Sequence, residues 1–227
     1  IHSEQIAKPN PKLDIFEFVY FARPDSKIFG TSVHNVRKNL GRQLSKEKHT
    51  DSDVVIGVPD SANVAAVGFS EESKIPYEIG FIRNHYIGRT FIEPRQEIRD
   101  FGAKIKYNPV AETLEGKDIV LVDDSIVRGT TSKKLIRMLK KAGVKKIHHR
   151  ISSPPIKCPC FYGIDTPQKS ELIASQKSSK EIEKHLGVDT LHYLSVEGLI
   201  KATGIPKERF CLACFTGEYP VEVGGRK

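Results

Sequence analysis

Short, largely apolar runs separated by polar turns predict a set of β-strands. The runs lie at 15–21, 54–58, 77–82, 119–122 and 147–151. The run at 119–122 contains no polar residue, which is typical of a strand buried on both faces of a parallel sheet. The run at 147–151 contains two histidines, His148 and His149, which we interpret as packing or surface residues.

Helical periodicity follows several of these strands. Apolar residues at 33, 36, 40 and 44 form one stripe of an amphipathic helix, with Ser32 as its N-cap. An alanine-rich segment predicts a helix that ends near Phe69, and a stripe over 135–142 predicts a helix that is closed by Gly143. Further short helices are expected at 181–186 and 196–202. The alternation of strands and helices predicts an α/β fold with a mostly parallel sheet flanked by helices.

The segments outside this pattern suggest three parts of the chain. Residues 1–13 are polar and contain two prolines, so they are expected to form a linker. Residues 14–155 form the expected core, within which the polar stretch 83–117 is interpreted as a lid or binding loop. Residues 156–227 form a C-terminal segment that is expected to be irregular from Pro154 onward and that carries all the cysteines.

Composition and charge restrict the class of protein only broadly. The 227 residues are 38% hydrophobic and 28% charged, which fits a soluble globular chain. No run of about 18 apolar residues exists, and the N-terminus has no signal-peptide pattern, so a cytoplasmic location is expected. The net charge of +8 is compatible with binding to nucleic acid, to an acidic surface or to a small polyanion. It is equally compatible with a basic protein surface that contacts only solvent. No block of like charges indicates a basic tail.

The most informative segment begins with the apolar run at 119–122 and extends to Thr131. Asp123 and Asp124 end the run, and a turn through Ser125 to Gly129 leads to a helix at about Thr130. Open α/β sheets bind ligands at the carboxyl ends of their strands. The backbone N–H groups of such a turn and the helix N-terminus attract phosphate. Adjacent acidic side chains can accept hydrogen bonds from ribose hydroxyls or bind Mg²⁺. The less specific interpretation is that they form a solvated acidic turn before a capped helix.

This segment closely resembles the phosphoribosyl pyrophosphate (PRPP) signature of the type I phosphoribosyltransferases. Other segments are similar to the glutamine PRPP amidotransferase family, in the same order, and together they span residues 14–222. They are 18–26, 58–61, 84–92, 152–155, 160–165 and 194–199. The resemblance implies a type I phosphoribosyltransferase fold. It also implies that ammonia displaces pyrophosphate from C1 of PRPP, which gives 5-phosphoribosylamine in the first step of purine synthesis.

The resemblance also implies roles for individual residues. Asp123 and Asp124 look like the carboxylates that bind ribose and Mg²⁺, with Ser61 as a third contact to Mg²⁺ and Asp60 beside it. The residues that resemble the 5′-phosphate loop are Ser125, Ile126, Val127, Arg128, Gly129, Thr130 and Thr131. Tyr86, Arg89 and Lys106 resemble residues of a loop that closes over PRPP. Arg89 and Lys106 would stabilise the charge on the departing pyrophosphate.

Two close cysteine pairs form a second candidate site. The spacing of Cys158 with Cys160 and of Cys211 with Cys214 fits a zinc site and an iron–sulfur cluster about equally. The resemblance implies a 4Fe–4S cluster, with Cys160, Cys211 and Cys214 at three ligand positions and Asp14 at the fourth. Three alternatives stay open: Asp14 binds the fourth iron, Cys158 substitutes for it, or a three-iron or absent cluster results.

The resemblance implies partners as well. The family has an N-terminal glutaminase half with a catalytic cysteine, and no cysteine precedes residue 158 here. The chain is therefore expected to be a fragment or a split subunit that uses free ammonia. A homotetramer and feedback inhibition by purine nucleotides are also implied. Arg83 and His85 depart from the usual Lys and Arg near the inhibitor site.

Two other classes of function remain as alternatives. One is a PRPP-binding regulator without catalysis, although no helix-turn-helix pattern for nucleic acid is visible. The other is a salvage phosphoribosyltransferase that acts on a free base. We expect neither a nucleic-acid partner nor a membrane partner.

Overall fold

The centre of the computed structural model is a four-stranded parallel sheet. Its strands are β4 (Val54–Gly57), β7 (Asp118–Asp123), β8 (Lys146–Ile151) and β9 (Thr190–Tyr193), in that order across the sheet. A parallel bridge between Val55 and Tyr77 extends the sheet at its β4 edge. The residues that the structure describes are Glu4, 8–84, 107–164, Thr166 and 168–221.

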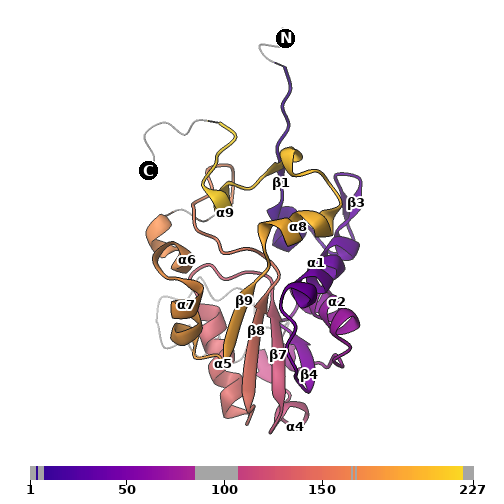
Figure 1. The fold of residues 1–227 in the computed structure, drawn as a ribbon, viewed down its shortest axis with the longest axis vertical. Coiled ribbons are helices and arrows are strands. Elements are labelled where there is room, and N and C mark those ends of the chain that lie inside the picture. The colour runs from indigo at the N-terminus through magenta and orange to yellow at the C-terminus, as the bar shows by residue number, and fades with distance from the viewer. Residues whose placement is uncertain (1–3, 5–7, 85–106, 165, 167, 222–227) are drawn as a thin grey trace.

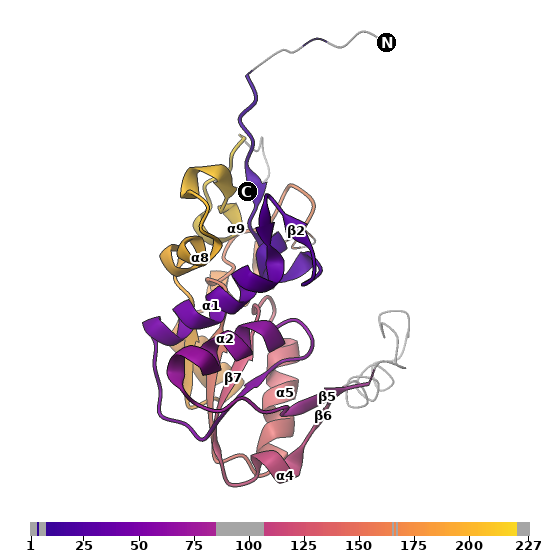
Figure 2. The ribbon, with the colours of Figure 1, turned by 90° about the vertical axis from the view of Figure 1, so that its right-hand side faces the viewer.

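Helices cover both faces of this sheet (Figures 1 and 2). Helices α1 (Val33–Glu47) and α2 (Asn63–Ser73) lie on one side, and α2 packs on β4 and β7. Helices α5 (Thr130–Lys141) and α7 (Ser179–Leu186) lie on the other side. Helix α8 (Val196–Thr203) packs on α1. Every residue of β4 and all but the first of β7 are buried, as expected of strands that are covered on both faces of a parallel sheet.

Short elements surround this core. Strand β1 (Leu13–Asp14) pairs in parallel with β10 (Phe210–Cys211), and β1 and α9 lie at the same end of the molecule in both views (Figures 1 and 2). The others are η1 (Glu17–Phe21), β2 (Lys27–Ile28), β3 (Thr31–Ser32), β5 (Phe81–Arg83), β6 (Tyr107–Pro109), α4 (Ala111–Leu114), η3 (Lys169–Glu171), α6 (Ile173–Gln176), η4 (Lys207–Arg209) and α9 (Ala213–Thr216). Strands β2 and β3 pair antiparallel, as do β5 and β6.

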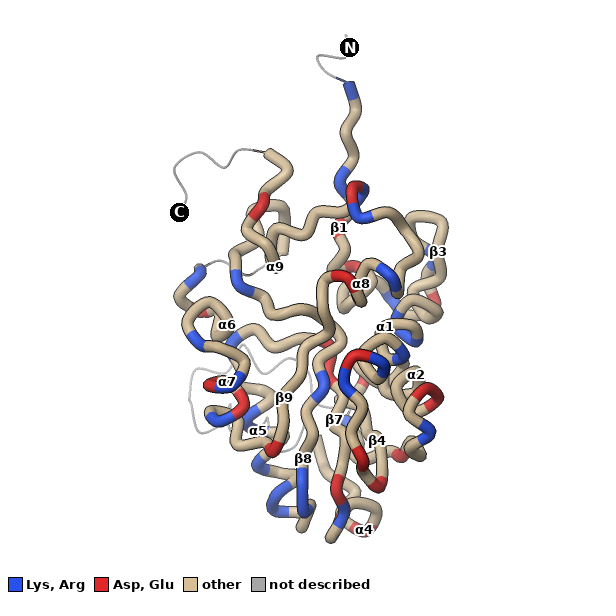
Figure 3. Tube along the Cα trace, in the orientation of Figure 1, with Lys and Arg blue, Asp and Glu red and all other residues tan. Residues whose placement is uncertain are grey.

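Most of the expected elements are confirmed. Ser32 caps α1, because its Oγ accepts a hydrogen bond from the backbone N–H of Asn35 at 3.3 Å. Gly143, with φ +82°, follows the end of α5 as predicted. Acidic and basic residues are interspersed along the chain (Figure 3). Among the described residues, no helix is both long and apolar enough to cross a bilayer.

The strand expected at 15–21 is wrong, because residues Glu17–Phe21 form a π-helical turn. The reason is the buried guanidinium of Arg37. It donates from Nε to the carbonyl oxygen of Phe18 at 2.9 Å, and from Nη2 to those of Tyr20 and Ala22 at 2.8 Å. The Arg37 side chain therefore donates the hydrogen bonds that these carbonyl oxygens would receive from a neighbouring strand if the segment were extended.

The two short helices expected after Pro154, at 181–186 and 196–202, are confirmed as α7 and α8, whereas the sheet strand β9 in this segment is not predicted from the sequence. The stretch 83–117 contains β6 and α4, while 85–106 lie outside the described residues. Of the strand expected at 77–82, only the bridge at Tyr77 and the start of β5 exist. The division at 155 stays a prediction, although β9 adds to the sheet of the preceding part.

Two glycines allow α1 and α2 to touch through their backbones. A Cβ on Gly41 would lie 1.8 Å from the carbonyl oxygen of Ala65, and one on Gly68 would lie 1.9 Å from that of Lys38. Neither distance is tolerable, and the neighbouring atoms belong to a helix backbone that cannot move alone. This contact holds α1 against the helix that covers β4 and β7.

We expect Gly41→Ala to lower the free energy of unfolding by about 1–3 kcal/mol, because the added methyl group forces the two helices apart. Chemical denaturation measures this change. His34→Ala, on the exposed side of the same helix, is the control and should change stability by less than about 0.5 kcal/mol. Equal stability of Gly41→Ala and the unmodified chain would contradict the close packing.

Candidate phosphate and metal site

Two carboxylates stand at the carboxyl end of the central strand β7. Asp123 is the last residue of this strand and Asp124 follows it, and both side chains are buried. The neighbouring strands fix the backbone here: Val58 N–H donates to the carbonyl oxygen of Val122 and Ser152 N–H to that of Asp123, both at 2.9 Å. The strand ends of a parallel sheet therefore position this pair, as the sequence predicts.

Hydroxyl and amide groups surround the two acids. Ser61 Oγ donates to Asp124 Oδ1 at 2.6 Å, and Ser125 Oγ donates to Asp124 Oδ2 at 2.6 Å. The backbone N–H of Asp124 donates to Asp123 Oδ1 at 2.9 Å, and the side chain of Ser132 also hydrogen-bonds Asp123. The segments 58–61 and 119–131, which the sequence singles out separately, thus meet at one point.

Burial makes the charged form of this pair costly. It raises the pKa of Asp123 well above its usual value, and the charge of Asp124 raises it further. Burial also raises the pKa of Asp124, while the hydrogen bonds from Ser125 and Ser61 oppose that rise. A bound cation or a set of hydroxyl donors would stabilise the ionised pair.

The buried, positively charged side chain of Arg37 lies near the two acids. The side chain of Arg37 is tied to the carbonyl oxygens of η1, and the charge of Asp124 favours its protonated form. Burial lowers the pKa of Arg37, and this effect outweighs the carboxylates of Asp124 and Glu17. The guanidinium thus supplies positive charge near the site while its own hydrogen bonds hold it in place.

The segment after the acids forms a turn into α5. Ile126 is buried and anchors the turn, and the backbone N–H of Ile173 donates to the carbonyl oxygen of Val127 at 2.9 Å. Gly129 has φ +76° and caps α5, a conformation that favours glycine. Thr130 and Thr131 lie exposed in the first turn of the helix. Backbone N–H groups and hydroxyls at such a helix start attract an anion.

Two predicted contacts have partners of their own. The guanidinium of Arg128 pairs with the carboxylate of Glu171, with 2.7 Å between Nε and Oε2. Asp60 pairs with Arg83, with 2.6 Å between Oδ2 and Nη1, and its carboxylate is half exposed. No described contact joins Asp60 to the two acids. Tyr86, Arg89 and Lys106 lie outside the described residues.

The cysteines and Asp14 gather at the other candidate site. Asp14 lies opposite Cys211 in the register of β1 and β10. Burial raises the pKa of the Cys214 thiol most, and the charges of Asp14, Cys211 and Cys160 raise it further. Burial likewise raises the pKa of Cys211, with smaller contributions from Asp14 and Cys160. These four side chains therefore lie close enough to interact electrostatically, and all four thiols of the chain are free.

Neither candidate site is a ready-made cage for a single metal ion. Within the described part of the chain, no three His, Cys, Asp or Glu side chains converge on one point. Mg²⁺ does not require this, because it usually keeps several waters and takes one or two carboxylates together with substrate phosphates. An iron–sulfur cluster does not require it either, since each protein ligand binds a different iron.

A model of the phosphoribosyl transferase domain matches residues 31–154, which is more than half of the chain. The chain belongs to the phosphoribosyl transferase family. The amidophosphoribosyltransferase of Methanocaldococcus jannaschii is 56% identical over 213 residues, which is 94% of this chain and 45% of that protein. The protein of that name from Bacillus subtilis is 52% identical over 218 residues, 94% of this chain and 46% of its own length.

Solved structures agree with this family assignment. The allosteric regulatory enzyme of purine biosynthesis matches with a TM-score of 0.87 and 52% identity, over 95% of this chain and 47% of that one. Glutamine PRPP amidotransferase from B. subtilis, solved with ADP and GMP, gives the same TM-score and identity, over 95% of this chain and 48% of that one. The expected type I phosphoribosyltransferase fold is confirmed. The chain spans about half the length of the relatives it matches.

Several residues near this candidate site are not predicted from the sequence. Arg37 sits beside the apolar stripe of its helix, where an arginine usually points to solvent. Ser132 lies in the first turn of α5, within a run of hydroxyl-bearing residues. The sequence does not indicate which of these hydroxyls points into the protein. His149 is fully buried, which agrees with its interpretation as a packing residue, but its Nε2 lies 3.9 Å from Asp123 Oδ2, a proximity that the sequence does not predict. No local sequence pattern distinguishes it from His148.

The raised pKa of Asp123 predicts a dependence of stability on pH. A carboxyl group with a raised pKa in the folded state stabilises the fold below its unfolded value, near 3.8, and this contribution is lost as pH rises through the folded value. We therefore expect Asp123→Asn to raise Tm by several degrees at neutral pH without Mg²⁺ or PRPP. The gain should shrink toward pH 4.

Thermal unfolding at several pH values measures this effect, with Asp51→Asn, on the exposed loop before β4, as the control. A lower Tm of Asp123→Asn at neutral pH would show that the carboxylate is not destabilised by burial.

Proposed function

We propose that this chain transfers the phosphoribosyl group of PRPP to ammonia, releasing pyrophosphate and forming 5-phosphoribosylamine, the first step of purine synthesis. The observation that carries this proposal is the buried acid pair, hydrogen-bonded to Ser61 and Ser125, directly before an anion-binding turn. The relatives named amidophosphoribosyltransferase support the choice of ammonia as acceptor.

The acids bind the ribose and a divalent cation in this proposal. Asp123 and Asp124 would accept hydrogen bonds from the ribose hydroxyls, and Asp124 and Ser61, which are joined by a hydrogen bond, would hold the cation. Mg²⁺, when bound with PRPP, stabilises the negative charge that develops on the departing pyrophosphate. Binding also relieves the electrostatic cost of two adjacent buried carboxylates.

The turn after the acids binds the 5′-phosphate. The backbone N–H groups from Ser125 to Gly129 and the hydroxyls of Thr130 and Thr131 donate hydrogen bonds to the phosphate oxygens. The acids at the end of β7 thus bind the ribose hydroxyls, and the turn that follows them binds the 5′-phosphate. Binding at both positions keeps C1 oriented toward the acceptor. Arg89, Lys106 and Tyr86 are proposed to close over pyrophosphate and exclude water, which competes with ammonia as a nucleophile.

The proposed partners are those that the relatives suggest. A B. subtilis relative has been solved with ADP and GMP, so purine nucleotides are proposed as inhibitors that bind near Arg83. A separate glutaminase domain as the source of ammonia, a homotetramer and a cytoplasmic location stay predictions.

The activity is tested by incubating the chain with PRPP, Mg²⁺ and ammonia and measuring released pyrophosphate. We expect Asp124→Asn to lower the rate by at least about 100-fold, because it removes a charge that the transition state needs. Asp51→Asn is the matched control and should leave the rate unchanged.

Two outcomes would contradict the assignment. Release that occurs with a free purine or pyrimidine base but not with ammonia would indicate a salvage enzyme. PRPP binding without turnover by any acceptor would indicate a regulator.

We also propose a 4Fe–4S cluster at the cysteine site, with Asp14 rather than Cys158 as the fourth ligand. The charge of Asp14 acts on both Cys211 and Cys214, and the register of β1 with β10 places Asp14 beside Cys211. Asp14 Oδ1 accepts the backbone N–H of Phe16 at 2.9 Å, which holds the carboxylate at this position.

Cys158 also lies at this site, because its backbone N–H donates to the carbonyl oxygen of Cys214 at 3.0 Å. Its charge acts on Tyr219 together with those of Cys160 and Cys214, whereas the charges that act on both Cys211 and Cys214 are those of Asp14 and Cys160. Thiolates are the usual ligands of such clusters, and one carboxylate oxygen at a single iron completes the set. The raised pKa values of Cys211 and Cys214 mean that cluster binding must release their protons.

Iron analysis and electron paramagnetic resonance after anaerobic purification test the fourth ligand. We expect Asp14→Ala to retain a three-iron cluster, whereas Asp14→Cys and Cys158→Ser retain the four-iron form. Conversion to a three-iron cluster by Cys158→Ser alone would assign the fourth position to Cys158. Bound zinc, or no metal in the unmodified chain, would refute the cluster itself.

A further inference from the structure

One face of the sheet carries three buried polar side chains near the end of β7. Residues in register on parallel strands, and residues two apart on one strand, point to the same face. Asp123 is in register with Ile151 of β8, which is in register with Tyr193 of β9. His149 lies two residues before Ile151, so His149, Asp123 and Tyr193 share the face on which Ser132 of α5 contacts Asp123.

The imidazole of His149 is fully buried and unusually isolated. Its exposed fraction is 0%, and neither ring nitrogen has a hydrogen-bond partner among the described protein groups. Its neighbours in register are apolar: Leu121 on β7 and Leu191 on β9. A buried polar group without a partner costs about 1–3 kcal/mol, so a leucine here would suit the fold better than a histidine.

Asp123 is the polar group that His149 faces. The Nε2 atom of His149 lies 3.9 Å from Asp123 Oδ2, while Asp123 Oδ1 accepts the backbone N–H of Asp124. A movement of about 1 Å brings Nε2 to hydrogen-bond distance from Oδ2. Hydrogen bonds in active sites are often long without substrate and shorten in the complex. Burial, with a contribution from the charge of Arg150, lowers the pKa of His149 to about 3, so the ring is neutral and keeps one N–H to donate.

We propose that His149 is a positioning residue for the reaction, which donates Nε2–H to Asp123 Oδ2 and fixes the orientation of this carboxylate toward the ribose and the cation. This role rests on the proposed function of Asp123. It explains why a polar ring occupies a position among leucines: the side chain lowers the stability of the fold and favours the ionised, correctly oriented Asp123.

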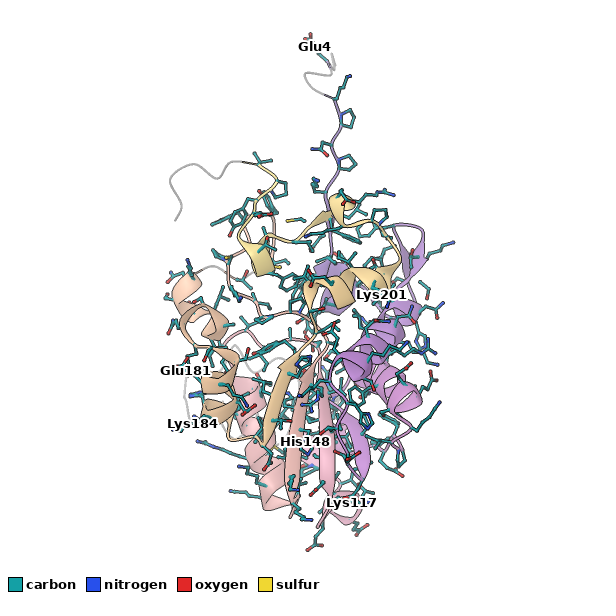
Figure 4. The ribbon with its side chains drawn as sticks, viewed as in Figure 1. Glu4, Lys117, His148, Glu181, Lys184 and Lys201 are labelled. Carbon is teal, nitrogen blue, oxygen red and sulfur yellow. The ribbon has the colours of Figure 1, made fainter. Side chains whose placement is uncertain are left out.

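His148 provides a matched control, because it is adjacent in sequence and points to the opposite face. It lies on β8 in the middle of the sheet (Figure 4), and its Nδ1 is 3.0 Å from Thr190 Oγ1. The experiment compares His149→Leu, His149→Gln and His148→Leu in the same chain. Glutamine places an amide N–H near the position of Nε2, whereas leucine has no donor.

We expect His149→Leu to lower kcat/KM for PRPP about tenfold, mainly through kcat, while Tm stays equal or rises. His149→Gln should recover most of the activity, and His148→Leu should leave kcat/KM unchanged. The combination of a maintained Tm with a lowered kcat separates positioning from a purely structural role. Thermal stability also tests the contact without substrate, because His149→Leu and Asp123→Asn should be non-additive.

Several results would overturn the inference. Unchanged kinetics of His149→Leu, or equal loss in His149→Gln and His149→Leu, would exclude donation to Asp123. Additive effects of His149→Leu and Asp123→Asn on Tm would exclude the contact even if the chain proved inactive. An inactive unmodified chain with non-additive Tm effects would instead refute the proposed reaction and keep the His149–Asp123 contact.

Discussion

The structure depends on keeping two adjacent carboxylates buried at the end of one central strand. Such a pair is unfavourable, because burial raises the pKa of both groups and the charge of Asp124 raises that of Asp123. The surroundings reduce this cost with directed donors: Ser61 and Ser125 on Asp124, and the backbone N–H of Asp124 on Asp123. These donors do not neutralise the negative charge of the two carboxylates, which a cation and the hydroxyls of a sugar can stabilise.

The parallel sheet brings these donors together from distant parts of the chain. Each strand ends at the same edge, so the turn after β4 delivers Ser61 to the acids that end β7. The N-terminal segment contributes differently, because its carbonyl oxygens hold Arg37. The same segment leads back to β1, which places Asp14 beside Cys211. One short stretch of chain therefore connects the acid pair with the cysteine site.

The sequence predicts the parts of this arrangement that local chemistry determines. The apolar run before Asp123, the hydroxyl-rich turn and the cap at Ser32 each have a local cause. Features set by distant partners are missed: the π-helical turn depends on Arg37, fifteen or more residues away. Strand β9 is missed because Thr190 and His192 interrupt its apolar pattern at the sheet edge. The place of His149 beside Asp123 depends only on the register of two strands.

Calorimetric titration of PRPP into the chain, with and without Mg²⁺, tests the central claim most directly. The acid pair predicts heat of binding that depends on Mg²⁺ and disappears in Asp123→Asn and Asp124→Asn, because these carboxylates would hold the cation that stabilises the charge of the substrate phosphates. Binding of equal strength without Mg²⁺, or binding that survives both substitutions, would contradict the claim that these buried carboxylates form the substrate site.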